Sequence, residues 1–299
     1  MTTFKHLVGT EQLNRQWLEK ELLTRASELQ TRNHTHTPLH KALYLLFYEP
    51  SFLTRTSFER AMDLLGGQPY FTEDASQFFP VRTPDYIENT IRNLGALDMD
   101  AVVLRTGEPG IVERAADADA IPVINGGSQG DHPTQAIADL YTIQRERGAV
   151  DDLNLLAVGR LEHRNVNALL RGLALFDNIT VWLSPFSGQV DPDVVSFCQA
   201  KGVTFETTGM ATVAEADVIY LNSPRTLAHI ELLKSRETLD VVIDEEFISK
   251  TKNNCIVLDP MQRSGDFEIT VQDDRLAYYR QAENALYTRM AVLSEILSI

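Results

Sequence analysis

The first residues that could bind a ligand or take part in a reaction form a polar stretch, 49–59. It reads Glu-Pro-Ser-Phe-Leu-Thr-Arg-Thr-Ser-Phe-Glu. Ser51, Thr54 and Ser57 supply hydroxyl donors and Arg55 supplies a guanidinium, at the start of a segment with helical periodicity. A helix N-terminus presents free backbone N–H groups, and hydroxyls with an arginine complete a donor set that suits a phosphate. An ordinary capped helix with one surface arginine uses the same residues. This stretch alone therefore does not define a site.

Other polar residues stand at comparable junctions, where a short apolar run ends or a helix begins. Arg105 and Arg164 each follow an apolar run, and His132 and Gln135 lie three residues apart at the start of a predicted helix. Side chains at this spacing lie on one face of a helix. Arginine binds carboxylates and phosphates through two parallel hydrogen bonds. The junctions together predict a pocket for anionic ligands.

Cofactor and metal sites are not indicated. The turn after Gly159 lacks the G-x-G-x-x-G spacing of dinucleotide-binding proteins. His34, His36 and His40 lie in a polar stretch without further metal-ligand spacing, so we expect them to be solvated. We therefore expect neither a metal nor a cofactor.

The elements that must position these residues are short apolar runs alternating with helical patterns. We expect strands at 42–48, 100–104, 121–124, 153–158, 179–183, 217–221 and 255–258. We expect helices at 13–30, 54–65, 84–94, 133–147, 165–176, 192–201 and 284–299. This alternation is typical of parallel sheets covered on both faces. The predicted fold class is α/β, with two doubly wound parallel-sheet domains, whose ligands bind beyond the carboxyl ends of the strands.

A hinge is expected at 148–152, after the helix 133–147. Residues 1–148 would form the first domain and residues 149–283 the second. The apolar periodicity of 284–299 predicts a final helix that packs back on the first domain.

Composition limits the possible partners. Lys and Arg total 27 against 42 Asp and Glu, a formal charge of −15, which argues against nucleic acid and anionic membranes. The longest apolar run is too short to cross a bilayer, and the N-terminus has no apolar leader. The two cysteines, Cys198 and Cys255, form no disulfide framework. A cytoplasmic location is expected.

In their order and separation, these motifs resemble the aspartate/ornithine carbamoyltransferase family over nearly the whole chain. In that family a Ser-Thr-Arg-Thr-Arg segment opens a helix and cradles carbamoyl phosphate, and residues 51–55 stand in its place here. Arg105 corresponds to the family's arginine after the next strand. The His-Pro-x-Gln motif is intact at 132–135, and Arg164 matches an arginine that faces the second substrate.

The departures from the family pattern concern both substrates. Phe52 and Leu53 replace the threonine and the first arginine of the phosphate motif. Asp259-Pro260-Met261-Gln262 stands where the family has His-Pro-Leu-Pro, and Ser223-Pro224-Arg225 stands where aspartate enzymes grip the acceptor with Arg-x-Gln. Arg82 is the nearest cation in the loop that a neighbouring subunit lends, where aspartate enzymes have lysine.

For the donor, the resemblance implies an amine attack on the carbonyl of carbamoyl phosphate. Thr54, Arg105 and His132 would donate to the carbamoyl oxygen, and Gln135 would accept from the carbamoyl amine. The donor-binding residues implied are Ser51, Phe52, Leu53, Thr54, Arg55, Arg82 and Arg105.

For the acceptor, the resemblance implies an amino acid whose carboxylate Arg164 binds. The remaining acceptor-side residues implied are Ser223, Arg225, Met261 and Gln262. Because neither the aspartate clamp nor the ornithine signature is reproduced, we expect an acceptor other than aspartate or ornithine. The family's assembly implies a homotrimer with active sites shared between subunits.

Two alternatives remain open. The apolar pair Phe52 and Leu53 would suit a different acyl-phosphate donor, larger or less charged than carbamoyl phosphate. A non-catalytic paralogue with a binding or regulatory role is the other. Retention of Arg105, His132, Gln135 and Arg164 favours an enzyme, because a scaffold has no use for these four polar groups.

Overall fold

The structure is a computed structural model that describes residues 4–32, 38–72, 74–78, 80–83, 85–222, 241–261 and 267–299. The chain divides into two units. Unit 1 contains Met1–Tyr141 together with Glu283–Ile299, and unit 2 contains Thr142–Ala282. The helices α6 (Pro133–Arg147) and α11 (Tyr278–Ile296) each include residues of both units.

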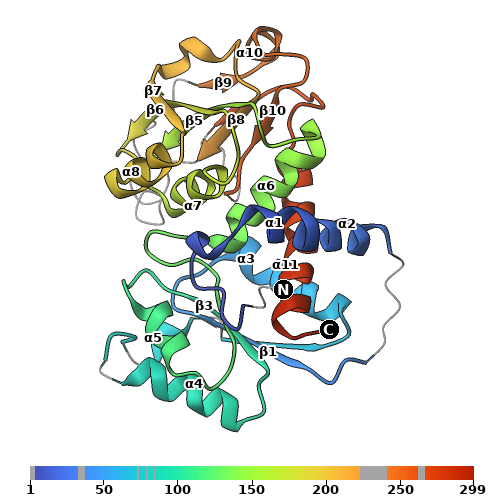
Figure 1. The fold of residues 1–299 in the computed structure, drawn as a ribbon, viewed down its shortest axis with the longest axis vertical. Helices are drawn as coiled ribbons and strands as arrows, with labels where there is room; N and C mark the ends of the chain where they lie inside the picture. The colour runs from blue at the N-terminus through green and yellow to red at the C-terminus, as the bar shows by residue number, and fades with distance from the viewer. Residues whose placement is uncertain are drawn as a thin grey trace. The chain divides into compact units, whose positions relative to one another are not determined.

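Unit 1 is built on a four-stranded parallel sheet, which we call sheet A (Figure 1). Its strands in spatial order are β2 (Gln68–Thr72), β1 (Ala42–Phe47), β3 (Ala101–Arg105) and β4 (Val123–Asn125). Residues Ala101 to Leu104 of β3 are fully buried, because helices cover both faces of the sheet. This double burial explains why the strand is an unbroken apolar run in the sequence.

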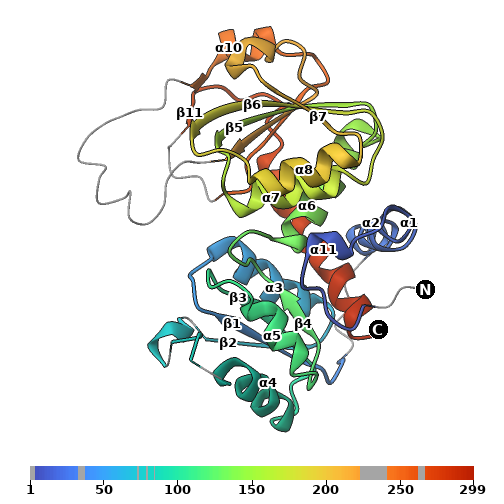
Figure 2. The same ribbon diagram turned by 60° about the vertical axis from the view of Figure 1, so that its left-hand side comes forward.

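Two groups of helices cover sheet A. The helices α4 (Tyr86–Ala96) and α5 (Ile111–Asp117) pack on the face that carries Leu46, Val102 and Leu104. The helices α3 (Phe52–Leu64) and α11 lie on the opposite side of the sheet (Figure 1 and Figure 2). Two short 3-10 helices, η1 (Thr10–Gln12) and η3 (Ala75–Gln77), complete this part of the unit.

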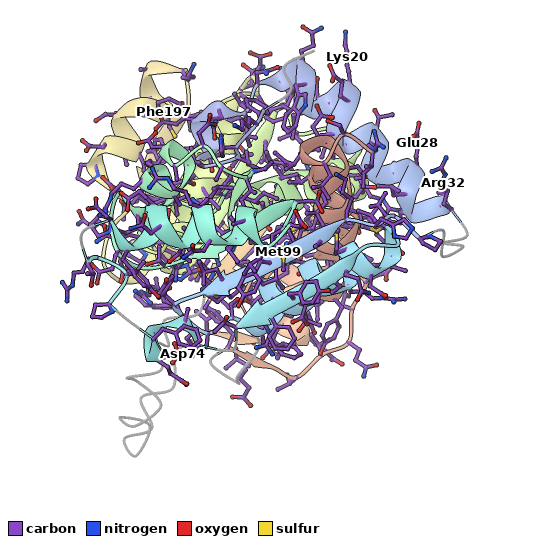
Figure 3. All side chains as sticks on the ribbon, turned by 90° about the horizontal axis from the view of Figure 1, so that it is seen from below. Lys20, Glu28, Arg32, Asp74, Met99 and Phe197 are labelled. Atoms are coloured by element: carbon purple, nitrogen blue, oxygen red, sulfur yellow. The ribbon has the colours of Figure 1, made fainter. Side chains whose placement is uncertain are left out.

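The N-terminal helical segment has one buried and one exposed face. It consists of α1 (Arg15–Trp17), a π-helical stretch η2 (Leu18–Leu22) and α2 (Leu23–Thr31). Its leucines and Ala26 are buried, whereas Lys20, Glu28 and Arg32 project outward (Figure 3). The apolar periodicity predicted this segment.

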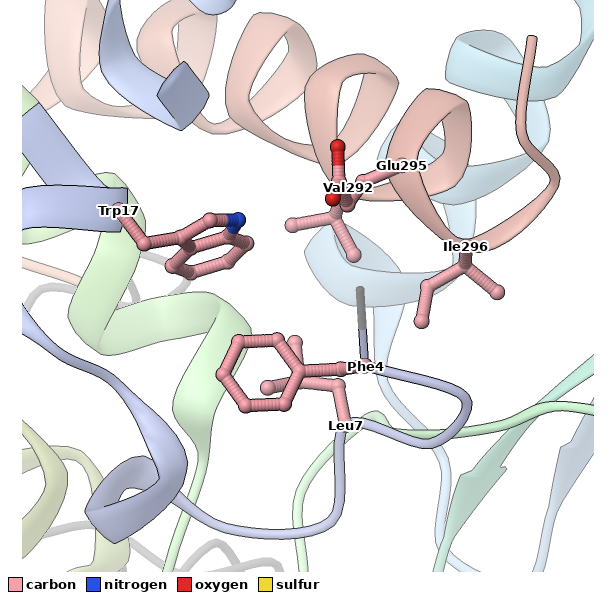
Figure 4. Close-up of a pocket in the computed structure, with 6 residues that line it drawn as sticks. All are labelled: Phe4, Leu7, Trp17, Val292, Glu295 and Ile296. Atoms are coloured by element: carbon pink, nitrogen blue, oxygen red, sulfur yellow. The ribbon is translucent and has the colours of Figure 1, made fainter. Parts of the chain in front are cut away.

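A small apolar hollow lies between this segment and the C-terminal end of α11 (Figure 4). The residues that line it are Phe4, Leu7, Trp17, Val292, Glu295 and Ile296. It offers a ligand one carboxylate and one indole among aliphatic and phenyl groups. Such a lining serves the packing of the two terminal segments.

Unit 2 contains a five-stranded parallel sheet, sheet B, and a two-stranded parallel sheet of β11 (Glu268–Ile269) and β9 (Val242–Ile243). The strands of sheet B in spatial order are β10 (Ile256–Leu258), β8 (Val218–Asn222), β5 (Leu153–Arg160), β6 (Ile179–Ser187) and β7 (Thr204–Thr207). The helices α7 (Arg164–Leu173) and α8 (Pro192–Ala200) cover one side, and α10 (Glu245–Lys250) lies on the other (Figure 2). A 3-10 helix, η4 (Gly209–Thr212), precedes β8.

The predicted fold class is confirmed: two α/β units with parallel sheets, the first completed by the C-terminal helix. Each expected strand and helix has a counterpart in the structure. Among the described strands and α-helices, the prediction missed β2, β7, β9, β11, α5 and α10. Within the described residues, no helix combines the length and the apolar character that a membrane span requires.

Candidate functional site

The order of strands in sheet A creates a natural ligand position. From β1 the chain moves to β2 on one side, and then to β3 and β4 on the other, so the winding direction reverses between β1 and β3. Phe47 and Arg105, the last residues of these two strands, are register partners. Open α/β sheets bind ligands beyond the carboxyl ends of the strands at such a switch point. The loops that follow Phe47 and Arg105 are therefore the candidate site of unit 1.

The first pair at this position is Thr54 and His132. Thr54 lies in the first turn of α3 and His132 directly precedes α6, and both are buried. The Oγ1 atom of Thr54 is 3.4 Å from Nε2 of His132, while Oγ1 of Thr134 is 3.4 Å from its Nδ1. The imidazole is thus held between two hydroxyls, with its Nε2 edge toward the start of α3.

Arg105 is held near His132 by the loop after β4. Its Nη1 atom donates to the carbonyl of Gly126 at 3.0 Å. Gly127 has a φ of +118°, and a Cβ atom there would overlap with Nη1 of Arg105 and lie 3.3 Å from Cδ2 of His132. Because only glycine leaves this space open, the loop backbone brings the guanidinium and the imidazole together. The Glu49 carboxylate lies 4.0 Å from Nε of Arg105 and offsets part of its charge.

Gln135 contributes an acceptor to the same helix start. It is 7% exposed and its Nε2 atom donates to Oδ1 of Asp139, one turn along α6, at 2.8 Å. Because this bond uses the amide nitrogen, the carbonyl oxygen of Gln135 is the atom available to a ligand amine.

The start of α3 differs from a conventionally capped helix. Ser51 is the N-cap residue in extended conformation, and its side chain makes no capping hydrogen bond. The first backbone N–H groups of the helix therefore keep their capacity for an anion. Phe52, which follows, is 58% exposed and Leu53 is half-buried.

Arg55 and Arg82 are not brought to this group. The Nε atom of Arg55 is 3.5 Å from the Glu59 carboxylate, and its guanidinium stacks 4.9 Å from the ring centroid of Phe71 on β2. The Arg82 side chain is 75% exposed, 3.9 Å from Glu108. Among the described arginines expected at the donor, Arg105 is the one that the contacts place beside His132.

Unit 2 repeats the same arrangement in sheet B. The winding reverses between β5 and β8, where Nδ2 of Asn222 donates to the Arg160 carbonyl at 2.8 Å. Arg164 is the first residue of α7, immediately after this strand end. His163 caps the helix by accepting from the Asn165 N–H at 3.3 Å. Arg164 therefore lies at the ligand-binding edge of its sheet.

Of the residues expected on the acceptor side, Met261 also lies here: its sulfur is 3.4 Å from Nδ2 of Asn165 on α7. Asp259 forms a turn by accepting from the Met261 N–H at 3.1 Å. Ser223, Arg225 and Gln262 lie outside the described residues. Among the described residues, those expected on the acceptor side thus lie on α7 and in the segment after β10.

Several residues that shape the donor side were not singled out from the sequence. Gly127 and Asn125 set the loop after β4, where Oδ1 of Asn125 accepts from the Gly127 N–H at 2.8 Å. Asp131 accepts from the backbone and hydroxyl of Thr10 and from the His132 N–H at 2.8 Å. The Gly126–Gly127 pair after an apolar run was the available signal. Within the described part of the chain, no group of three or more His, Cys, Asp or Glu side chains could hold a metal ion.

Fold and site together define a class: a two-unit parallel α/β protein with polar groups at both switch points. Family models agree. The carbamoyl-phosphate-binding domain of aspartate/ornithine carbamoyltransferases matches residues 5–145, and their aspartate/ornithine-binding domain matches residues 151–296. The chain belongs to the aspartate/ornithine carbamoyltransferase family, as its motifs predicted, and the family's enzymes are transferases.

Relatives and solved structures are consistent with this placement. The chloroplastic aspartate carbamoyltransferase of Oryza sativa subsp. japonica is 35% identical over 93% of this chain and 79% of its own. Chloroplastic aspartate carbamoyltransferase 1 of Pisum sativum is 36% identical over 84% of this chain and 67% of its own. The structure of aspartate transcarbamoylase from Trypanosoma cruzi with carbamoyl phosphate and aspartate has a TM-score of 0.83 at 27% identity, covering 97% of this chain and 96% of that one. The catalytic subunit of M. jannaschii aspartate transcarbamoylase has a TM-score of 0.82 at 27% identity, with 99% and 98% covered.

Proposed function

We propose that this protein transfers the carbamoyl group of carbamoyl phosphate to the amino group of an amino-acid-like acceptor. The observation that carries the proposal is the assembly of Thr54, Arg105, His132 and Gln135 at the switch point of sheet A. Three of these side chains offer donors and the fourth offers an acceptor, which is the complement of a carbamoyl group.

In this mechanism the amine nitrogen attacks the carbonyl carbon, and the carbonyl oxygen becomes an oxyanion. Arg105, His132 and Thr54 donate hydrogen bonds to that oxygen, and Gln135 accepts from the carbamoyl amine. The bond between the carbon and the bridging oxygen then breaks, and phosphate leaves with the electron pair. The proton lost by the attacking amine passes to the departing phosphate. Fixed donors aimed at the developing charge supply most of the rate enhancement in such sites.

The phosphate is held by the first N–H groups of α3 and Ser51, beside Arg105. Arg55 is left out of this set, because it is engaged with Glu59 and Phe71. The proposal assigns donor binding to residues 1–148 with 284–299, and acceptor binding to 149–283. Arg82, which is exposed in this chain, would serve the donor site of a neighbouring subunit in a homotrimer.

For the acceptor, we propose an amino acid other than aspartate or ornithine, whose carboxylate pairs with Arg164. Ser223 stands where the aspartate enzymes have the arginine of their clamp, and a serine cannot bind a second carboxylate as a bidentate pair. A cytoplasmic location is part of the same proposal. It is supported by two buried cysteines that are not joined in a disulfide.

The first test is calorimetric titration of the protein with carbamoyl phosphate, with inorganic phosphate as the reference ligand. Binding at least about tenfold tighter than phosphate is expected, because the carbamoyl group adds hydrogen bonds to four side chains. Equal binding of the two ligands by folded protein would overturn the proposed donor. Titration with other acyl phosphates would then test whether exposed Phe52 belongs to a different donor site.

The second test is an amine panel scored for ureido product in the presence of carbamoyl phosphate. The panel includes L-aspartate and L-ornithine beside neutral, basic and longer acidic amino acids. Turnover of another amino acid with little turnover of these two is expected. Efficient carbamoylation of aspartate would contradict the acceptor proposal and leave carbamoyl transfer intact.

A further inference from the structure

Arg289 on α11 is a buried cation that the proposed chemistry does not use. Its side chain is 2% exposed, and burial lowers its pKa to about 10. It therefore remains protonated at neutral pH. A buried charge is tolerated only where protein groups replace the lost water, so the partners of Arg289 show what it holds.

One set of partners is the first part of α3. The Nη1 atom of Arg289 donates to Oγ of Ser57 and to the Leu53 carbonyl at 3.5 Å. Its guanidinium lies 5.2 Å from the ring centroid of Phe58. Ser57 in turn donates to the carbonyls of Leu53 and Thr54. Arg289 thus supports the turn of α3 that presents Thr54.

A second buried charged group of unit 1 is Asp139 on α6. The negative charge of Asp139 counteracts part of the lowering of the Arg289 pKa. Asp139 also accepts the hydrogen bond from Nε2 of Gln135 at 2.8 Å. Because the amide nitrogen makes this bond, the NH₂ group of Gln135 faces Asp139 and its carbonyl oxygen does not.

We propose that Asp139 is a positioning residue that fixes the Gln135 carboxamide with its carbonyl oxygen toward the carbamoyl amine, and that Arg289 anchors the Thr54 turn of α3. This inference rests on the proposed function, in which Gln135 accepts from the donor's amine. Neither Asp139 nor Arg289 touches the substrate. Their effect is to make the site distinguish a carbamoyl phosphate from a phosphate.

The test compares affinities for carbamoyl phosphate and inorganic phosphate in the Asp139→Asn variant. Asparagine has the same shape but can donate to the carbonyl oxygen of Gln135, which frees the Gln135 amide to turn its NH₂ toward the substrate amine. The preference for carbamoyl phosphate over phosphate is expected to fall about tenfold or more. Phosphate affinity is expected to change less than about threefold, because the start of α3 is untouched.

A double variant, Gln135→Glu with Asp139→Asn, provides the rescue. Here the asparagine introduced by the second substitution donates to the new carboxylate, whose other oxygen again faces the substrate as an acceptor, and the pair of side chains keeps one negative charge. At least part of the lost preference should return. The matched control is Asp117→Asn, the same substitution at an exposed position of α5, which should keep the wild-type preference.

The outcomes are separable. A wild-type protein without preference for carbamoyl phosphate would overturn the proposed function. A wild-type preference that Asp139→Asn leaves unchanged would overturn the role of Asp139 and leave the proposed function standing. If Asp139→Asn alone does not fold, the folded double variant decides: a preference above that of Gln135→Ala supports the inference, and an equal one contradicts it.

Discussion

Leu53 removes a positive charge from the proposed donor site, compared with the family's motif. It occupies the position of an arginine in the family's phosphate motif, and the neighbouring Arg55 is engaged with Glu59. Arg105 therefore carries most of the positive charge beside His132, and Glu49 at 4.0 Å reduces even that. Two consequences can be measured at the level of single side chains.

The first prediction concerns Arg105. Replacing it by glutamine should weaken carbamoyl phosphate binding about a hundredfold, because a charge-assisted pair of donors is lost where the described contacts place no second arginine. Calorimetry measures the effect. Arg60→Gln, at an exposed position of α3, is the control and should bind as the wild type does. Unchanged affinity in Arg105→Gln would refute the assignment of this residue.

The second prediction is a gain of affinity for the donor. Leu53→Arg should raise the affinity for carbamoyl phosphate about tenfold, since it adds a charge-assisted hydrogen bond at the first turn of α3. The same variant should raise phosphate affinity by a similar factor, which competition with phosphate would measure. A loss of affinity for both ligands would mean that position 53 does not face the phosphate.

At the scale of elements, the loop after β4 sets the spacing of Arg105 and His132. Gly127→Ala should weaken carbamoyl phosphate binding at least about tenfold and lower the free energy of unfolding by about 2 kcal/mol, because the new Cβ atom overlaps with Nη1 of Arg105 and the backbone φ is +118°. Gly130→Ala, in the same loop with open space around its Cα, should change binding little. Equal effects of both variants would argue against the close approach of Gly127 to the Arg105 guanidinium.

A second set of interactions between elements connects α10 to the segment before α11 through hydrogen bonds. Arg275 donates to Asp273, to the Ile248 carbonyl at 3.0 Å and to Oγ1 of Thr251 at 3.1 Å. The hydrogen bonds from Arg275 lower the pKa of Asp273 from 3.8 to about 2. The folded state therefore favours the ionised carboxyl.

Because the folded state favours the ionised form of Asp273, the stability of the protein should depend on pH. The contribution of Asp273 to stability is complete above about pH 4 and is lost as the pH falls toward about 2. Asp273→Asn should lower the free energy of unfolding by about 1 kcal/mol at about pH 6, and the difference from wild type should shrink toward zero near about pH 2. Urea unfolding across this range measures it. A constant difference at all pH values would show that the charge is not responsible.

The sequence predicted the buried elements well and the edges of the sheets poorly. The strands β1, β3, β5 and β8 are covered on both faces, so their sequences are apolar runs. The edge strands β2 and β7 are mostly exposed and carry no such run, and the helices α5 and α10 are too short for a clear period. The spacing of apolar residues in a sequence reflects burial, so elements with little buried surface cannot be predicted from it.

The site could be predicted in part for a similar reason. Residues at strand ends gather at one edge of a parallel sheet, which is why Thr54, Arg105 and His132 were expected together. Which arginine of a stretch faces the site depends on packing partners such as Phe71, and these come from elsewhere in the chain. The proposed role of Arg289 was also hidden, because its partner Ser57 lies 232 residues away along the sequence.

For the whole molecule, the net charge of −15 opposes the approach of an anionic donor. Raising the ionic strength with sodium chloride from about 10 to about 150 mM should therefore speed the association of carbamoyl phosphate, by about twofold, since screening weakens the repulsion of distant acidic residues. Stopped-flow measurement with a neutral ligand analogue as control tests this. A slower association at higher salt would mean that the arginines near the site dominate the field.

The return of α11 to unit 1 has a consequence for how the protein is made. Residues 142–282 form a contiguous unit, whereas unit 1 also requires 283–299, which the ribosome adds after the whole of unit 2. Until those residues emerge, Ser57 lacks the guanidinium of Arg289 that it contacts in the finished protein. The order of synthesis and the order of folding therefore differ: unit 2 can fold before unit 1, and the proposed donor site matures only after residues 283–299 have emerged.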